Sequence, residues 1–410
     1  MASKSGTSAP ARRIRASVDH GRCVNVAPHT PQRFLSSAHL VIIGLRAGVS
    51  RTGVQNGCAG PCYDSGVTSQ RAGVVVLLLV VAAFGCSRRV AEPTPAPSAT
   101  TVSVPTTGGA YFTVAPVDLA SVDYINPLGH MTTPFNALPQ GRMYLVFRNP
   151  SETYPVFAPA EGTIVWINGP KPDYRIQIQV DATFTYFVDH VTLEPGLQQG
   201  GLVAAGQRIG AHSGITCCLD FGAMSTQVVA GYANQARYSP ESMNADSPIR
   251  HFAEPLRSQL YAKVTRVSDG LDGRADYDRP GRLSGNWFLE GTPEAGSLLP
   301  ENWPRQLAFA YSNTHPSRIL VSIAGTLPIV NLCTVQDGAP DPATIGVGNG
   351  KIAYQLFQKD PPVSEGDGRG RLLGLMIVQM LDDASIRIEV FPGNAATTAE
   401  FTAAARIYTR

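Results

Sequence analysis

Apolar and polar residues alternate in short runs along the chain from about residue 113 onward. Tyr174–Val180 alternates strictly, as a strand with one buried face does. The apolar run Leu372–Leu381 is followed by Asp382–Phe391, in which an Asp-Asp-Ala-Ser turn leads into a second alternating run, so this pair predicts a β-hairpin. The chain is therefore expected to be mainly β.

The clearest helix candidate is Ser247–Val264. Its apolar residues Phe252, Leu256, Leu260 and Val264 recur every four positions, although Pro255 disfavours helix in the first half. The glycine- and aspartate-rich stretch at 265–280 then predicts a boundary. We expect two β-rich domains, at residues 113–265 and 275–410.

A different pattern precedes them. An uncharged apolar run from Ala72 to Gly85 follows Arg71 and ends at Cys86. It is short for a membrane-spanning helix, which needs roughly 20 residues, and is typical of a lipoprotein signal at residues 67–86 with Cys86 as the lipidated residue. A plain membrane anchor or a buried helix is the alternative.

The flanks of this signal lack a pattern that could build a core. Residues 1–66 are rich in Arg, Ser and Gly and are interpreted as a disordered extension or a misassigned start. Residues 87–112 are rich in Pro, Thr and Ser, which predicts an extended linker.

Charge separates the leader from the remainder. The leader, residues 1–85, holds nine of the 33 Lys and Arg residues and two of the 31 Asp and Glu residues, so the remainder carries a formal charge of about −5. Nothing in this balance points to a nucleic-acid partner.

Glycine turns between apolar runs mark the first domain. Val156–Ile167 reads VFAPAEGTIVWI, Gly200–Gly214 reads GGLVAAGQRIGAHSG, and the run FTYFVDHVTLEPG with His190 lies between them. Over residues 124–224 these pieces resemble the core of the LytM/lysostaphin-type zinc endopeptidases that cut peptidoglycan cross-bridges. The resemblance implies an antiparallel sheet and a zinc-dependent hydrolase site.

The residues that the resemblance assigns to that site differ from the family pattern. Cys218 and Asp220 stand where the family has the two histidines of its His-Leu-His strand, and Asn136 and Gly141 stand near the early histidine and aspartate. His190 matches the solitary histidine that assists catalysis. Because a zinc site needs three N, O or S ligands and an open position, we expect no metal and no cofactor.

Three further candidates come from the residues alone. Cys218 could act as a nucleophile with His190 as its base, although a small buried cysteine pair, Cys217 and Cys218, is the simpler interpretation. In an oxidising compartment the pairing of Cys333 with Cys217 or with Cys218 stays open. His212, in a glycine-flanked turn, is expected to be exposed.

The second domain opens with Gly285-Asn286-Trp287, which resembles the start of lipocalins, where a tryptophan closes the barrel floor. A Trp287 buried in a generic β-sandwich explains the motif as well. The first domain also resembles biotinyl and lipoyl carrier domains. Their modified lysine has no counterpart here, because Lys171 lies between two prolines.

These observations predict a membrane-anchored lipoprotein of the bacterial cell envelope. Its first domain is expected to be a degenerate lysostaphin-like module that binds peptidoglycan or an envelope protein. The alternatives are an active zinc endopeptidase with other ligands, such as His130 or His251, and lipocalin-like small-molecule binding by the second domain.

Overall fold

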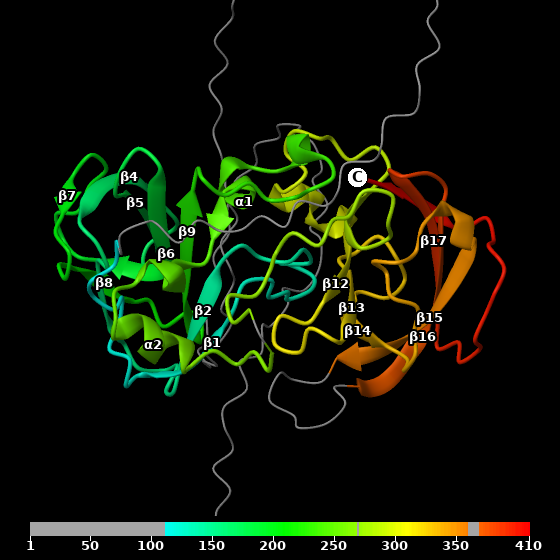
Figure 1. The fold of residues 1–410 in the computed structure, drawn as a ribbon, viewed down its shortest axis with the longest axis horizontal. Coiled ribbons are helices and arrows are strands. Elements are labelled where there is room, and N and C mark those ends of the chain that lie inside the picture. The colour runs from blue at the N-terminus through cyan, green and yellow to red at the C-terminus, as the bar shows by residue number, and fades with distance from the viewer. Residues whose placement is uncertain (1–110, 269, 360–368) are drawn as a thin grey trace, which may run out of the picture. The chain divides into compact units, whose positions relative to one another are not determined.

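The structure is a computed structural model that describes residues 111–268, 270–359 and 369–410 (Figure 1). The expected extension, signal and nearly all of the linker, together with Cys86, lie outside these ranges. Tyr111 and Phe112, at the end of the expected linker, belong to the fold, since Phe112 is fully buried. Within the described ranges, no helix combines the length and apolar character that crossing a membrane requires.

The first domain is a ten-stranded antiparallel sheet with the central order β1-β2-β9-β6-β5-β4-β7. The other three of the ten strands lie off this central path: β10 pairs with β9, and β8 pairs with both β3 and β6. The strands are β1 (Val122–Asn126), β2 (Met143–Phe147), β3 (Pro155–Phe157), β4 (Gly162–Asn168), β5 (Tyr174–Gln179), β6 (Phe184–Leu193), β7 (Leu202–Val203), β8 (Arg208–His212), β9 (Cys218–Ser225) and β10 (Ala245–Asp246).

Alternation along these strands builds the core of the sheet domain. In β5 the predicted strand is confirmed, and Ile176 and Ile178 are fully buried while Gln177 between them is only partly buried. Aromatic side chains fill the space against the sheet: the Phe112 ring meets Tyr186 edge-on at 5.3 Å and Phe252 at 4.9 Å between centroids. The buried face of the sheet thus carries the apolar half of the alternating pattern.

The predicted helix at Ser247–Val264 is wrong as a single element. The segment forms the 3-10 helix η2 (Pro248–His251) and the α-helix α2 (Leu256–Tyr261). Pro255 stands directly before α2 because proline lacks the N–H that a helix interior needs. The other short helices are η1 (Gln235–Arg237), α1 (Pro240–Met243), η3 (Pro300–Arg305) and η4 (Val347–Asn349).

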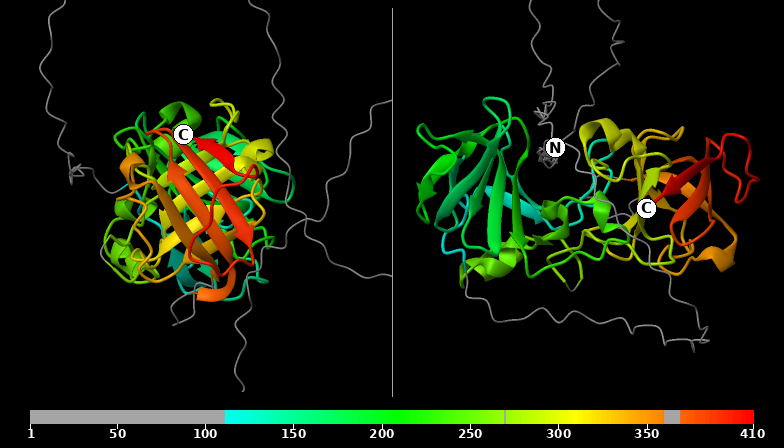
Figure 2. Two further views of the ribbon diagram at one scale, coloured as in Figure 1. Left: turned by 90° about the vertical axis from the view of Figure 1, so that its right-hand side faces the viewer. Right: turned by 90° about the horizontal axis from the view of Figure 1, so that it is seen from above.

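The second domain is a closed antiparallel barrel in which each strand pairs with the next and the last with the first. Its strands run in yellow to red in Figure 2. They are β11 (Gly285–Leu289), β12 (Gln306–Tyr311), β13 (Ile319–Ile323), β14 (Asn331–Val335), β15 (Lys351–Lys359), β16 (Arg369–Met380), β17 (Ser385–Pro392) and β18 (Arg406–Thr409). The predicted hairpin is confirmed as β16 and β17, and of the two expected architectures the barrel is the observed one.

Trp287 lies in the core of the barrel with no exposed surface. Its indole N–H donates to the Leu283 carbonyl oxygen at 2.9 Å, and the Arg410 guanidinium lies 4.1 Å from the ring centroid. The ring is therefore held by a hydrogen bond and a cation–π contact as well as by burial.

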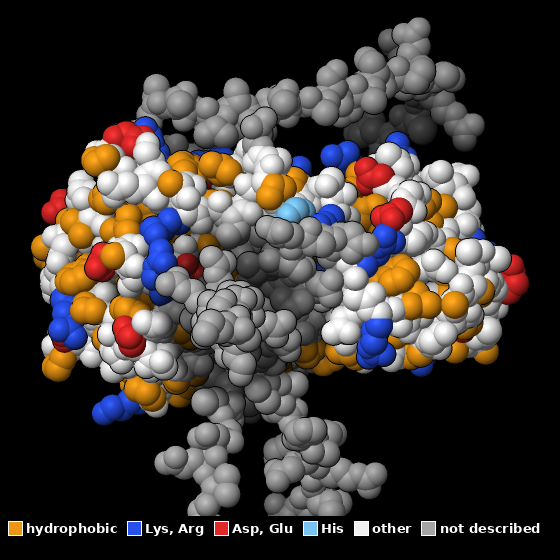
Figure 3. All heavy atoms as spheres, turned by 90° about the horizontal axis from the view of Figure 1, so that it is seen from below, with side chains coloured by type: hydrophobic (Ala, Val, Ile, Leu, Met, Phe, Trp, Pro, Cys, Tyr) orange, Lys and Arg blue, Asp and Glu red, His pale blue; other side chains and the backbone are white. Residues whose placement is uncertain are grey.

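Side-chain contacts also join the loop between β1 and β2 to the barrel. The amide of Asn313 donates to the Pro127 carbonyl oxygen at 2.9 Å, and Met131 and Leu138 share a hydrophobic cluster with Leu320. On the face drawn in Figure 3, basic, acidic and apolar side chains are interspersed.

Candidate functional site

The pairing of β6 with β9 brings acidic residues together at the end of the two strands. Asp189 lies directly opposite Asp220, and β2 on the other side of β9 places Tyr144 opposite Asp220. Asp220 is 2% exposed and Asp189 is 7% exposed. Buried carboxylates at this density require cationic partners.

His190 supplies one of these partners. Its Nδ1 lies 3.1 and 3.2 Å from the two carboxylate oxygens of Asp173, and its Nε2 lies 3.9 Å from Oδ2 of Asp220. Burial alone would lower the pKa of His190, but the Asp173 hydrogen bond and the charges of Asp220 and Asp189 raise it to about 9. The ring is therefore protonated at neutral pH, with about a quarter of the side chain exposed.

The backbone of His190 is unusual for a residue with a side chain. Its φ angle is +67°, in the left-handed region that favours glycine. Such strain costs of order 1–3 kcal/mol and persists where surrounding contacts hold the residue. Here the Asp173 carboxylate holds the ring, and the His190 carbonyl oxygen accepts from the Ser213 N–H at 2.7 Å.

Arg142 supplies the cation next to Asp220. Its Nε donates to Oδ2 of Asp220 at 2.7 Å, and only 17% of the arginine side chain and 4% of the aspartate side chain are exposed. Arg142 directly precedes β2, so the register of β2 against β9 aims it at the carboxylate. A charge-assisted hydrogen bond is roughly twice as strong as a neutral one, and burial spares this pair much of the solvent screening that weakens surface ion pairs.

Arg175 forms a second buried pair beside the first. Its guanidinium contacts Asp189 at 2.5 Å and Glu241 at 2.8 Å, and stacks over the Phe187 ring at 4.2 Å from the centroid. Together with Arg142, His190 and their carboxylates it forms the charge cluster, which we define as Arg142, Asp173, Arg175, Asp189, His190, Asp220 and Glu241.

Sequence reasoning missed Asp173, Arg142, Arg175 and Glu241. Arg175 could have been noticed from the sequence, since it is a charged residue within a strictly alternating strand. Its partners Asp189 and Glu241 could not, because they lie 14 and 66 residues away along the chain. The Arg142 contact spans 78 residues, which no local pattern reports.

Of the predicted residues, His190, Asp220 and Cys218 do lie together. The Cys218 thiol donates to Oδ1 of Asp220 at 3.6 Å, as residues two apart on one strand can. A hydrogen bond with Cys217 and burial raise the pKa of the Cys218 thiol. A cysteine nucleophile needs either a thiolate or a thiol beside a neutral base that can take its proton. Here the thiol form of Cys218 is favoured and His190 is held protonated, so neither condition is met.

The residues expected at the early ligand positions lie elsewhere. Asn136 hydrogen-bonds the Thr132 side chain at 3.2 Å, and Gly141 faces Ala245 so closely that an added Cβ would come within 2.6 Å of the alanine Cβ. The positions beside Asp220 belong to Arg142 and Tyr144.

The alternative ligands have other partners. His130 packs edge-on against the Tyr144 ring at 4.9 Å between centroids, and burial lowers its pKa to about 4. Nε2 of His251 contacts Asp246 at 2.8 Å. Neither histidine ring is therefore seen in contact with the Asp220 carboxylate.

Two expectations about other residues are also resolved. His212 is not exposed: β8 carries it into the sheet, where its ring packs at 4.7 Å from the Phe147 ring and retains 1% exposure. Among the described cysteines, Cys217, Cys218 and Cys333 form no disulfide, so the expected pairing is wrong, and Cys333 is buried in the barrel core.

The side chains at this site do not fit zinc. Within residues 111–268, 270–359 and 369–410, no three His, Cys, Asp or Glu side chains are grouped as metal ligands. More directly, the Arg142 guanidinium donates a hydrogen bond to Oδ2 of Asp220, the oxygen that a metal would need as its ligand. Tyr144, an aromatic residue, lies opposite Asp220 on the neighbouring strand. A dication beside this guanidinium would meet like charge.

Comparisons with known proteins give partial likenesses. No protein-family model matches the sequence, and no curated protein matches it. Among solved structures, Helicobacter pylori Csd3 is similar at 16% identity over 28% of this chain and 32% of that chain, with a TM-score of 0.23. A zinc-containing peptidase from Vibrio cholerae is similar at 21% identity over 28% and 37%, with a TM-score of 0.23. The SpoIIQ–SpoIIIAH pore-forming complex is similar at 16% identity over 28% and 85%, with a TM-score of 0.24. The chain thus spans about a third of the length of the Csd3 chain that it matches.

Proposed function

We propose that this protein is a lipid-anchored component of the bacterial cell envelope whose sheet domain binds without hydrolysing. The expected ligand is peptidoglycan or an envelope protein, and the binding surface is the exposed edge of the charge cluster around His190. Fold and activity are separable, so a degenerate hydrolase scaffold can keep a binding face.

The observation that carries this proposal is the ion pair of Arg142 with Asp220. The pair holds a fixed organic cation against the carboxylate that a catalytic metal would need. Because Asp220 is almost fully buried, its charge needs this partner for stability. The pair therefore supports a structural role for Asp220.

His190 supports a binding role for the edge of the cluster. Its imidazolium is partly exposed while its Asp173 and Asp220 contacts face inward. A protonated ring that is held in place can donate to a carboxylate or carbonyl of a peptide at small entropic cost. A peptide stem of peptidoglycan and a protein loop both present such groups.

The test uses the protein without its signal and lipid anchor, residues 87–410, incubated with insoluble peptidoglycan sacculi. We expect the protein to sediment with the sacculi, to release no soluble fragments with or without added zinc, and to contain less than stoichiometric zinc. His190→Ala should weaken sedimentation, while Arg148→Ala, at an exposed ion pair on the same domain, should not.

Two results would separate the alternatives. Stoichiometric zinc together with soluble fragments would establish the zinc endopeptidase and end this proposal. Absence of sedimentation together with specific cross-linking to an envelope protein would retain a non-hydrolytic module and assign it the protein partner.

A further inference from the structure

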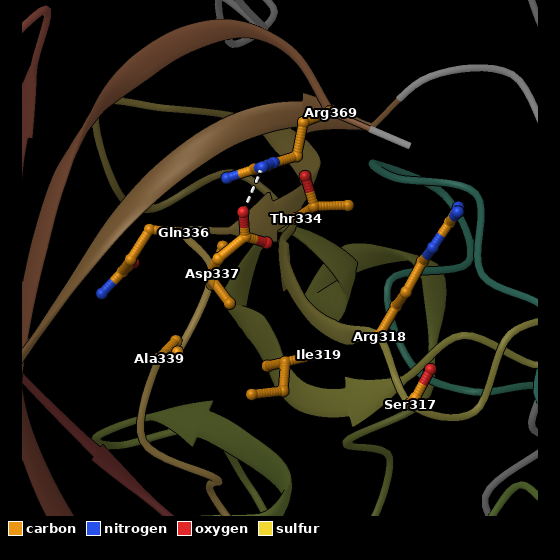
Figure 4. Close-up of a pocket in the computed structure, with 10 residues that line it drawn as sticks. Ser317, Arg318, Ile319, Thr334, Gln336, Asp337, Ala339 and Arg369 are labelled. Carbon is orange, nitrogen blue, oxygen red and sulfur yellow. Dashed lines mark hydrogen bonds and ion pairs between the residues drawn. The ribbon is translucent and has the colours of Figure 1, made fainter. Parts of the chain in front are cut away.

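The barrel domain carries a pocket that is separate from the charge cluster. It has a volume of about 190 Å³ and lies where the start of β13, the end of β14 with its following turn, and the first residue of β16 come together (Figure 4). Sites for drug-sized ligands span roughly 300–1,000 Å³. This pocket therefore suits a molecule with few heavy atoms.

A buried hydroxyl in the lining has no hydrogen-bond partner. Thr334 is 4% exposed, and its Oγ1 is one of the buried side-chain atoms of the described chain without a partner. In Figure 4 this oxygen points toward the Arg369 side chain. An unsatisfied buried polar atom costs of order 1–3 kcal/mol, so a ligand that hydrogen-bonds Thr334 would recover that cost.

The charged lining is positive overall, with Arg318 and Arg369 against Asp337. The Arg369 guanidinium contacts Oδ2 of Asp337 at 2.5 Å, but 87% of the aspartate side chain is exposed. An exposed acid is a weak partner for arginine, worth about 0–1 kcal/mol. A ligand carboxylate in the pocket could share or replace it through a two-point contact with the guanidinium.

The remaining wall is apolar. Val335, Ile319 and Ala339 line this wall. Val335 belongs to the barrel core, and Ile319 and Ala339 pack against that core. A ligand that fits both walls has a charged head at Arg369 and Thr334 and a short alkyl part on Ile319 and Ala339.

We propose that this pocket binds the carboxylate of a small aliphatic acid. The head accepts hydrogen bonds from the Arg369 guanidinium and the Thr334 hydroxyl, and the alkyl part covers Ile319. This goes beyond the proposed function of the sheet domain and does not depend on it.

The test is titration of the full chain with hexanoate, followed by ligand-observed NMR, with 1-hexanol as the uncharged probe of equal length. We expect saturable hexanoate binding at millimolar concentrations and at least about tenfold weaker binding of hexanol. Arg369→Gln should raise the Kd for hexanoate about tenfold, and Thr334→Val, which keeps the shape, about fivefold.

Asp337→Asn should change the Kd for hexanoate in the opposite direction. Removing the competing carboxylate should lower the Kd about threefold. Arg406→Gln, an exposed barrel arginine outside the pocket, is the matched control and should leave the Kd unchanged.

Equal binding of hexanol and hexanoate, or no saturable hexanoate binding, would overturn the proposal. So would an unchanged Kd in both Arg369→Gln and Thr334→Val. If the thermal melt shows that Arg369→Gln is unfolded, the test rests on Thr334→Val and Asp337→Asn. Tighter hexanoate binding by Asp337→Asn together with weaker binding by Thr334→Val then sustains the proposal, and any other combination overturns it.

Discussion

Removal of Arg142 tests whether the charge cluster is a buried structural unit. Arg142→Met keeps the aliphatic length of the side chain but leaves the Asp220 carboxylate, which is 4% exposed, without its guanidinium. Breaking a buried pair by removing one partner typically costs 3–5 kcal/mol. Because His190 remains 3.9 Å from the same oxygen, we expect the lower end of that range, about 3 kcal/mol of unfolding free energy.

Removing both charges should cost much less. In Arg142→Met combined with Asp220→Leu, no buried charge is left alone at this position, and replacement of a buried pair by apolar groups is often neutral or stabilising. We expect the double variant to lie within about 1 kcal/mol of the wild type, well below the sum of the costs of the two single variants.

Urea unfolding followed by circular dichroism measures both quantities. With a slope of 1–3 kcal/mol per molar, a loss of about 3 kcal/mol moves the sheet-domain midpoint by roughly 1–3 M. Arg148→Met is the control, since Arg148 directly follows β2 and pairs with Asp123 at 3.5 Å with 56% of its side chain exposed. It should cost under about 1 kcal/mol. An Arg142→Met cost as small as that of the control would refute the buried-pair reasoning.

Four other outcomes are expected. His190 has a pKa of about 9 in the folded protein and 6.5 in the unfolded one, so its contribution to stability is full below about pH 6.5 and is lost as the pH rises toward 9. The loss is at most about 3 kcal/mol. Urea midpoints of His190→Gln should not show this decrease with pH. His212 has its pKa lowered by burial to about 4, so stability should fall between pH 6.5 and 4; His212→Leu should weaken that fall, and a retained full loss would contradict this assignment. Trp287→Ala should cost about 3–5 kcal/mol by opening a cavity in the barrel core, visible as a lowered melting temperature of the second domain. Cys86→Ser should abolish lipid labelling and leave uncleaved precursor, and normal processing of that variant would return Cys86 to an ordinary role.

The sequence by itself determined the strands in which one face is regularly buried. The alternation in β5 and the paired runs of β16 and β17 predict their elements correctly, because burial of one strand face leaves a period of two in the local sequence. Pro255 likewise indicates from the sequence alone that helix is disfavoured in the first half of its segment, whereas the division into η2 and α2 is seen only in the structure.

Only the tertiary structure decided what these strands enclose. A sandwich and a barrel share the same local pattern, and closure depends on the pairing of β11 with β18, more than a hundred residues apart. The burial of His212 likewise depends on the pairing of β8 with β3 and β6, which a glycine-flanked sequence does not report.

The charge cluster shows the same division. His190, Asp220 and Cys218 could be singled out because a family resemblance marked their positions, but their surroundings could not. Register places Arg142 against Asp220, and a contact across 78 residues leaves no periodic trace in the sequence. The physical reason is that strand formation follows from the near sequence, whereas the charge that faces a buried carboxylate is set by which strands pair and in which register.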